Sequence, residues 1–340
     1  MNLKSISYYL GLFCFPISIL AFINILYSSY FDYFLSINSY FITLVFSLIF
    51  GSGFLFLGKK SKKRINFIEQ LLLVVLVYLV TSFFISIPFY LSNYQVTFLN
   101  SLFESISGVT GTGFSIFSNI KYLDPTLILW RSSSQWIGGL YFLIFLIIVF
   151  SNKQFNYKMN ELSYSGDGSI NTVSNIKDLL FKIFILYSIL SLIIFILLNF
   201  VNIRMFNSLN LSMSLISSGG FMPTDSLNKI ITSNSQKIIF IISLLIPLLN
   251  FFIILNIFEK KTLIRDHQED LYLLILSIVF ILLIYLNNYS GLNIIISVLS
   301  SLSNSGLSLL NSDSNLSLYF ILITIIGGSI ISNTSGIKLA

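Results

Sequence analysis

Charged side chains are scarce in this sequence. Asp, Glu, Lys and Arg make up 9% of the 340 residues, hydrophobic residues make up 55%, and the mean hydropathy is +0.89. A soluble domain carries about a quarter charged residues. So few charges cannot cover a water-facing surface, and we therefore expect membrane lipid to surround much of the chain.

Cysteine and histidine are almost absent, since Cys14 and His267 are the single residues of these types. One cysteine supports neither a disulfide framework nor a thiolate metal site. The sequence also lacks the cluster of Asp, His and Cys that a membrane enzyme would need, and it has no nucleotide-binding glycine motif. We predict that the chain is not an enzyme and that it has no covalently bound cofactor.

Long apolar runs fill most of the sequence instead. A bilayer crossing needs about 20 apolar residues. The runs predict membrane-spanning helices at 8–28, 39–57, 66–91, 125–150, 177–201, 236–258 and 268–287, and a last one that begins near Asn315. The predicted fold class is an all-α polytopic membrane protein.

The positions of lysine and arginine predict the orientation, because cytoplasmic loops are enriched in both. The run Lys59–Arg64 places its loop in the cytoplasm. Alternation from there puts 13 basic residues on the cytoplasmic side, namely Lys4, the five of this run, Lys153, Lys158, Lys177, Lys182, Lys260, Lys261 and Arg265. The outside receives 5, namely Lys121, Arg131, Arg204, Lys229 and Lys237. This bias predicts a multi-pass protein of the cell (inner) membrane with a cytoplasmic N-terminus, and it explains the basic run without nucleic acid.

Three segments on the outside are too short to span the bilayer and too apolar to be free loops. They are 97–109, 206–216 and 293–302, and each leads into a cluster of small polar residues and glycine that is followed by Phe or Leu. The clusters align on Gly113, Gly220 and Gly306. Each belongs to a repeated unit of helix, short pore helix, loop and helix.

Such a unit has a specific physical use. Non-helical backbone at membrane depth is tolerated only inside protein or beside water. A short helix that stops at a glycine leaves carbonyl oxygens that can replace the water of a dehydrated cation. Glycine permits the positive φ that turns these carbonyls toward one axis, and the C-terminal end of a helix is partly negative. One cluster alone would favour a helix-packing interface of small residues, whereas three favour filter loops around a pseudo-symmetric pore.

Several stretches resemble a known family. Residues 107–115 read Ser-Gly-Val-Thr-Gly-Thr-Gly-Phe-Ser, residues 129–139 include Leu-Trp-Arg-Ser and Gln-Trp-Ile-Gly-Gly, and residues 217–221 read Ser-Ser-Gly-Gly-Phe. They resemble the first filter loop, the start of the next helix and the second filter loop of the TrkH/KtrB/HKT family of potassium transport subunits. Residues 327–338 resemble the family's glycine-rich break, which forms a gate under the filter, and residues 8–57 resemble the extra helix pair of the TrkH branch. The third loop is the weakest match, because the family has threonines there.

The resemblance implies potassium uptake by the pore-forming subunit of a Trk-type system. The implied selectivity filter consists of Thr110, Gly111, Thr112, Gly113, Ser217, Ser218, Gly219, Gly220, Ser303, Asn304, Ser305 and Gly306. The implied gate consists of Gly327, Gly328, Ser329, Gly336 and Lys338, and Arg131 would support the filter. Glu104 lies on the first predicted pore helix, where it would either bond to the loop and support the filter or add negative potential at the mouth. Ordinary alternatives are a snorkelling lysine at 338 and an interface anchor at 131. No metal is implied beyond the transported potassium ion.

The family surrounds its pore with four units, whereas this sequence shows three. We divide it into an N-terminal helix pair (1–58), a first pore unit (59–152), a second (153–260) and a third, incomplete at its end (261–340). We therefore expect a partial sequence, or a fourth unit supplied by a separate chain. A non-conducting remnant and a secondary transporter for another cation such as sodium are the alternatives, although a secondary transporter would favour inverted repeats and these units run in one direction.

Partners are implied by the same resemblance. They are membrane lipid, a second copy of the chain in a homodimer, and a cytoplasmic nucleotide-binding regulatory subunit of the TrkA/KtrA type. That subunit would dock on the loops 58–66, 151–176 and 259–268. The choice between potassium and sodium, and between channel-like flow and coupling to protons or sodium, stays open at this point.

Overall fold

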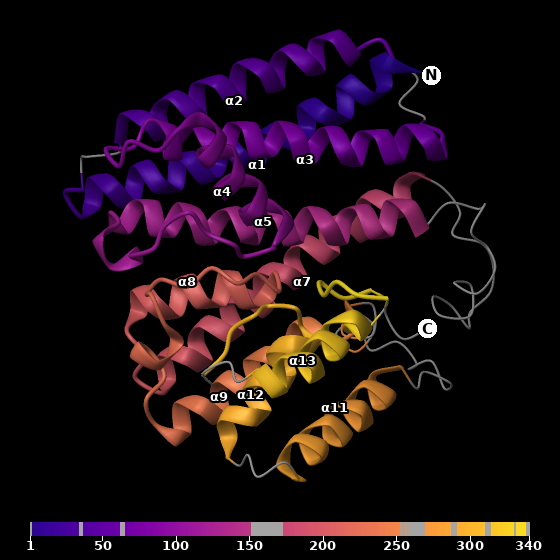
Figure 1. Ribbon diagram of the computed structural model, residues 1–340. Helices are drawn as coiled ribbons and strands as arrows, with labels where there is room; N and C mark the ends of the chain where they lie inside the picture. The colour runs from indigo at the N-terminus through magenta and orange to yellow at the C-terminus, as the bar shows by residue number, and fades with distance from the viewer. Residues whose placement is uncertain are drawn as a thin grey trace. The chain divides into compact units, whose positions relative to one another are not determined.

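The computed structural model describes residues 2–33, 37–61, 65–150, 173–251, 254, 257, 269–286, 291–309, 314–329 and 331–337. Every regular element within these ranges is a helix (Figure 1). The chain divides into two compact units, Met1–Gly138 and Gly139–Ala340. The predicted all-α class is therefore confirmed, whereas the finer division into a helix pair and three pore units stays a prediction.

Two long helices open the first unit. Helices α1 (Leu3–Tyr30) and α2 (Ile37–Gly58) pack against each other. A Cβ atom on Gly11 would lie 2.7 Å from the carbonyl oxygen of Gly51, so the two backbones approach as closely as small residues allow in membrane helices. Helix α3 (Phe67–Tyr90) packs against both of them. The Glu69 carboxylate accepts the backbone N–H of Asn66 at 2.9 Å and also that of Asn2, so it fixes the starts of α3 and α1.

A short helix follows in the first unit. Helix α4 (Phe98–Thr110) contacts α3, and the Thr97 hydroxyl caps its first turn by accepting the N–H of Asn100. The turn η2 (Ile120–Tyr122) leads to α5 (Pro125–Phe150), which begins in the first unit and continues into the second. Proline suits the first helical position, where no intrahelical N–H bond is lost.

The connection between α4 and α5 is pinned by Tyr94. Its hydroxyl accepts the N–H of Asp124 at 2.6 Å and donates to the carbonyl of Tyr122 at 3.1 Å. Partial burial raises the pKa of Tyr94, although the bond from the Asp124 N–H lowers it in part, and the nearby Asp124 carboxylate adds a smaller increase. The phenol therefore stays neutral at physiological pH, and both bonds persist.

The second unit repeats the pattern twice. Its first part contains α7 (Val173–Phe200), α8 (Met205–Ile216), η4 (Leu227–Lys229), α9 (Asn234–Leu245) and η5 (Ile246–Leu248). Its second part contains α11 (Glu269–Leu286), α12 (Leu292–Leu302) and α13 (Ser314–Ile326). Helix α8 packs on α7, and α12 packs on α9, α11 and α13. In both parts a short helix thus follows a longer one.

Five helices in the described ranges are long and apolar enough to cross a membrane, namely α1, α2, α3, α5 and part of α7. The predicted span at 236–258 is wrong as one continuous helix. Helix α9 ends at Leu245, a 3₁₀ turn follows, and Leu249 has extended backbone with ψ 154°. Pro247 explains the break, because proline has no N–H and its ring clashes with the preceding turn.

Candidate functional site

The three short helices α4, α8 and α12 end in the same backbone motif. The residue two places before each aligned glycine has a positive φ, with values of 72° at Gly111, 56° at Ser218 and 59° at Asn304. Its N–H bonds to the carbonyl three residues back, and the next N–H bonds to the carbonyl five residues back. The pairs are Gly111–Gly108 and Thr112–Ser107, Ser218–Leu215 and Gly219–Ser214, and Asn304–Ser301 and Ser305–Ser300, all between 2.8 and 3.1 Å. These are Schellman motifs. In each motif, the carbonyl that bonds to the N–H five residues ahead belongs to a serine.

The motif decides which carbonyl groups each short helix leaves at its end. It uses the carbonyls of Ser107 and Gly108 in the first unit, and it leaves those of Val109 and Thr110 at the partly negative end of α4. The corresponding carbonyls after α8 are those of Ile216 and Ser217, and that of Ile216 already accepts a bond from the Asn333 amide at 2.6 Å. The partly negative C-terminal end of a helix attracts a cation. Each of the three loops begins at a helix end of this kind.

One expectation about glycine holds only in part. Gly113 and Gly306 have φ values of 80° and 66°, whereas Gly220 is not among the positive-φ residues of the described chain. In the second loop the left-handed residue is Ser218 instead. The carbonyl of Gly219 accepts a bond from the Ser214 hydroxyl at 2.9 Å, so this oxygen is engaged within its own loop.

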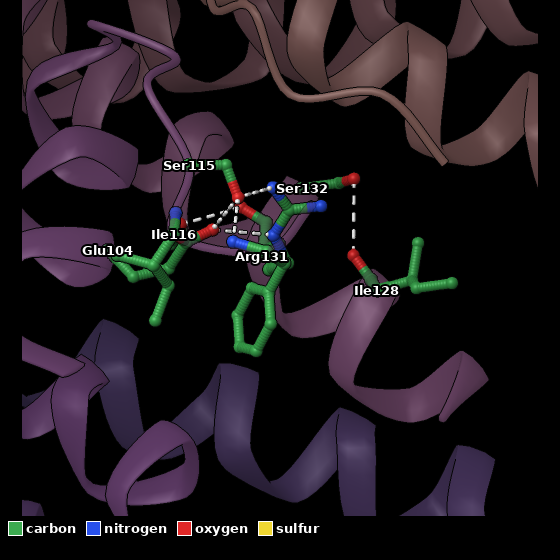
Figure 2. A network of polar contacts seen from close by, with 8 residues as sticks. Glu104, Ser115, Ile116, Ile128, Arg131 and Ser132 are labelled. Carbon is green, nitrogen blue, oxygen red and sulfur yellow. Dashed lines mark hydrogen bonds and ion pairs between the residues drawn. The ribbon is translucent and has the colours of Figure 1, made fainter. Parts of the chain in front are cut away.

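A buried ion pair supports the first loop from behind (Figure 2). Arg131 Nε lies 2.7 Å from Glu104 Oε1, and the two side chains are 1% and 0% exposed. The Ser115 hydroxyl, just after the loop, donates to Glu104 Oε1 at 3.0 Å and accepts from Arg131 Nη2 at 2.9 Å. The N–H of Ile116 donates to Glu104 Oε2 at 2.8 Å. The pair therefore holds the chain that leaves the loop against both α4 and α5.

Close backbone contact fixes the loops from the side of α5. A Cβ on Gly138 would lie 1.9 Å from the carbonyl oxygen of Val109, and one on Gly139 would lie 2.7 Å from Ser217 Cβ. Any side chain at Gly138 would displace the end of α4, and one at Gly139 would displace the start of the second loop. The two glycines of the Gln-Trp-Ile-Gly-Gly stretch are thus required by packing.

The third loop is held by side chains of its own. The hydroxyls of Ser303 and Ser300 each lie 3.0 Å from that of Ser305. The Asn304 amide nitrogen reaches out of the loop and donates to the carbonyls of Ser335 at 3.1 Å and Thr324 at 3.3 Å. Asparagine here both accepts the left-handed backbone and contacts the break that follows α13.

That break is a closed loop. Helix α13 ends at Ile326, and the N–H of Ile337 returns to the carbonyl of Ile325 at 2.8 Å. Gly327 and Gly336 meet at the neck with φ values of 73° and 107°, and a Cβ on Gly327 would lie 1.9 Å from the carbonyl oxygen of Ser335. Inside the loop, Thr334 Oγ1 accepts the N–H of Gly328 at 2.9 Å.

The break also pairs with the interruption after α9. The N–H of Ser329 donates to the carbonyl of Leu248 at 3.1 Å, and the N–H of Phe251 donates to that of Ile331 at 2.9 Å. Two non-helical segments thus satisfy each other's backbone groups, as lipid requires of any non-helical chain at membrane depth. Sequence reasoning missed the residues at 248–251, although Pro247 was a usable signal.

Comparison with known proteins identifies the chain. The sequence signature of the cation transport protein family TrkH matches residues 36–306. The chain belongs to the TrkH family. This confirms the predicted family, and because the family consists of cation transport proteins it also confirms the prediction that the chain is not an enzyme.

The relatives are distant. An uncharacterized cation transporter of Methanocaldococcus jannaschii is 25% identical over 292 residues, which are 84% of this chain and 60% of the relative. The potassium uptake protein TrkG of Escherichia coli is 28% identical over 34% of this chain and 24% of its own length. The chain therefore spans less than two thirds of these relatives.

The fold matches a solved TrkH structure. The crystal structure of the potassium transporter TrkH from Vibrio parahaemolyticus superposes with a TM-score of 0.86 at 19% identity, over 99% of this chain and 73% of the other. At this identity the match establishes the TrkH fold.

The structure places the predicted site residues in two sets. Thr110, Gly111, Thr112 and Gly113 follow α4 in the first unit. The other filter residues follow α8 and α12 in the second unit, together with the gate residues Gly327, Gly328, Ser329 and Gly336. Lys338 lies outside the described residues, as do most of the residues in the predicted docking loops 151–176 and 259–268. The roles of all these residues in conduction stay predictions.

Proposed function

We propose that the chain is the pore-forming subunit of a Trk-type potassium uptake system in the cell (inner) membrane, with its N-terminus in the cytoplasm. The observation that carries the proposal is the identical Schellman ending of α4, α8 and α12, which presents helix-end carbonyls at each loop of a TrkH-family chain. The names of potassium transporters among its relatives agree with this proposal.

In this proposal potassium enters from outside and exchanges its water for carbonyl oxygens of 110–113, 217–220 and 303–306. Any further loops that the complete pore requires would add to these. The ion then passes the break at 327–338. The membrane potential supplies about 2.3 kcal/mol per charge per 100 mV, and no covalent step is needed. This chain has serine and asparagine at loop positions where the family has threonine. Uptake measurements with both ions therefore decide between potassium and sodium.

The proposal predicts that Gly113→Val strongly lowers uptake. A β-branched residue at φ 80° costs about 1–3 kcal/mol, and the loop would turn its carbonyls away to relieve that strain. We expect rubidium uptake to fall by more than about tenfold in cells that lack other potassium uptake.

The matched control is Gly53→Val in α2, where an added Cβ meets nothing within 4 Å. This control should leave uptake unchanged. Normal rubidium uptake by the Gly113→Val variant would refute the filter assignment. Sodium uptake in place of rubidium uptake by the unmodified chain would favour the sodium alternative, and uptake of neither ion would favour a non-conducting remnant.

A further inference from the structure

A cleft in the first unit borders the chain that leaves the first loop. It is lined by the segment that joins α3 to α4, by the start of α4 and by the segment that joins α4 to α5, and its volume is about 360 Å³. Ile116 and Phe117 line it, and the N–H of Ile116 is the group that donates to Glu104. Small-molecule sites occupy about 300–1,000 Å³, so the cleft has room for a small ligand.

The side chains that line the cleft carry no charge. Among these described residues none is an acid, a lysine or an arginine, and the nearby Lys121 and Asp124 do not line it. The Arg131 guanidinium lies 5.8 Å from the centre of the Phe117 ring, so this ring already makes a cation–π contact. An ionic ligand would lose its water without gaining a charged partner. The cleft therefore suits an uncharged ligand.

Four polar side chains of the cleft are open to such a ligand, namely those of Gln95, Asn100, Ser118 and Asn119. All four residues are exposed, and none of these side chains forms a hydrogen bond within the described part of the chain. An amide offers two donors and an acceptor, and a hydroxyl can both donate and accept. Hydroxyl groups of a ligand need partners of both kinds, which these side chains supply.

Aromatic rings form another part of the walls. The rings of Tyr94 and Phe117 are inclined at 77° with centroids 6.3 Å apart, and Tyr122 is 75% exposed. Tyrosine in such a position offers a large rigid contact area at a low cost in conformational entropy. A sugar ring has C–H groups on its faces, which pack on aromatic rings, and hydroxyl groups round its edge. Rings beside unbonded amides match both parts of a sugar.

The walls are fixed without a ligand. The Tyr94 hydroxyl accepts the N–H of Asp124 at 2.6 Å and donates to the carbonyl of Tyr122 at 3.1 Å, so it joins the two connecting segments. Gln95 has a φ of 52°, a conformation that is uncommon for residues other than glycine. A site that is formed in advance binds more tightly, because less of it has to be ordered on binding.

We propose that this cleft binds an uncharged saccharide on the predicted outer side of the membrane. The amides of Gln95, Asn100 and Asn119 pair with the sugar hydroxyls, and the ring of Tyr122 covers one face of the sugar. The saccharide is either free or the headgroup of a glycolipid, because both present the same hydroxyl groups. The site goes beyond the proposed function, since binding requires no ion to pass.

The test applies the purified full chain, in a detergent without a sugar headgroup, to an array of uncharged and acidic saccharides. We expect binding to uncharged saccharides. The affinity of the best one is then measured in solution for the unmodified chain and for two variants. Tyr122→Ala should weaken binding about tenfold by removing the stacked ring. Gln95→Gly, which keeps the left-handed backbone and removes the amide, should weaken it about three- to tenfold.

Each variant has a matched control. Asn202 is also exposed and has a φ of 59°, and it lies between α7 and α8 as Gln95 lies between α3 and α4. Asn202→Gly thus removes an exposed amide from a left-handed residue outside the cleft. Tyr30, at the end of α1, is 81% exposed, so Tyr30→Ala is the control for Tyr122→Ala. Both controls should bind the saccharide as the unmodified chain does.

The same saccharide is also offered in two forms, free and as the headgroup of a glycolipid in lipid nanodiscs. Binding of the free form identifies a soluble sugar, and binding of the lipid form alone identifies a glycolipid, and both support the site. Binding of acidic saccharides alone, binding of none, or full affinity in both cleft variants overturns it. Rubidium uptake is measured separately, so a chain that binds the saccharide but conducts no ion keeps this site and loses the proposed function.

Discussion

At the scale of single residues, Glu104 and Arg131 are a neutralised charge pair inside a chain that has little charge. Both side chains are buried, and their atoms are 2.7 Å apart. A buried ion pair contributes little net stability compared with apolar residues of similar volume, because desolvation offsets the attraction. Its value here is geometric, since it also binds Ser115 and Ile116 at the exit of the first loop.

This argument predicts different effects for single and double substitutions. Glu104→Leu alone leaves the Arg131 charge buried and should lower the free energy of unfolding by about 3–5 kcal/mol. The double variant Glu104→Leu/Arg131→Met should restore most of that stability, because apolar replacement of a buried pair is close to neutral. The double variant should nevertheless lose ion selectivity, because Ser115 and Ile116 lose their bonds to the charged pair.

Thermal unfolding in detergent and rubidium-to-sodium uptake ratios measure the two effects separately. Arg131→Lys serves as an intermediate case, since a lysine lacks the planar fork that reaches both Glu104 and Ser115. A stable double variant with an unchanged uptake ratio would show that the pair only stabilises the fold.

At the scale of elements, three different residue types adopt the same backbone conformation. Gly111, Ser218 and Asn304 all adopt the left-handed conformation at the end of a short helix. Glycine does so without steric cost, asparagine at a low cost and serine at a higher one. The hydrogen-bonded motif, and not the residue type, is what the three loops share.

The neck of the break gives a prediction at this scale. Gly327→Ala and Gly306→Ala both place a Cβ at positive φ, 73° and 66° respectively. The added Cβ meets the Ser335 carbonyl at 1.9 Å in the first case and nothing within 4 Å in the second. We expect Gly306→Ala to lower the free energy of unfolding by about 1–2 kcal/mol and Gly327→Ala to lower it by clearly more, as measured by unfolding in detergent. Equal effects would mean that the neck opens freely.

At the scale of the whole molecule, the predicted orientation can be tested because the chain has one cysteine, Cys14, which is buried. In a Cys14→Ser background, an impermeant maleimide on intact cells should label Asn119→Cys and not Lys60→Cys, although both positions are exposed. Permeabilised cells should show labelling of both. The opposite pattern would reverse the orientation inferred from the lysine and arginine bias.

The proposed regulatory partner is also a prediction at this scale. A tagged chain should co-purify with a cytoplasmic nucleotide-binding ring, and Lys59→Glu/Lys60→Glu should weaken that association because these exposed lysines lie on the expected docking side. Lys121→Glu on the opposite side is the control. Repeated failure to recover such a ring would remove it from the proposal.

The sequence alone determined the membrane class, the repeated unit and the TrkH resemblance. Lipid imposes the length of each span and forbids unpaired backbone, so apolar runs and glycine-centred clusters are readable without a structure. The sequence predicted separate supporting roles for Glu104 and Arg131, and the structure shows that the two side chains pair with each other and with Ser115 and Ile116.

Only the tertiary structure decided the rest. The interruption at Pro247, its backbone pairing with 329–331, and the contacts of Asn304 and Asn333 join segments far apart in the chain. No local pattern encodes which carbonyl an asparagine amide will meet, because that depends on how helices pack. The sequence thus predicted the loops and the break, whereas helix packing determined which atoms form hydrogen bonds between them.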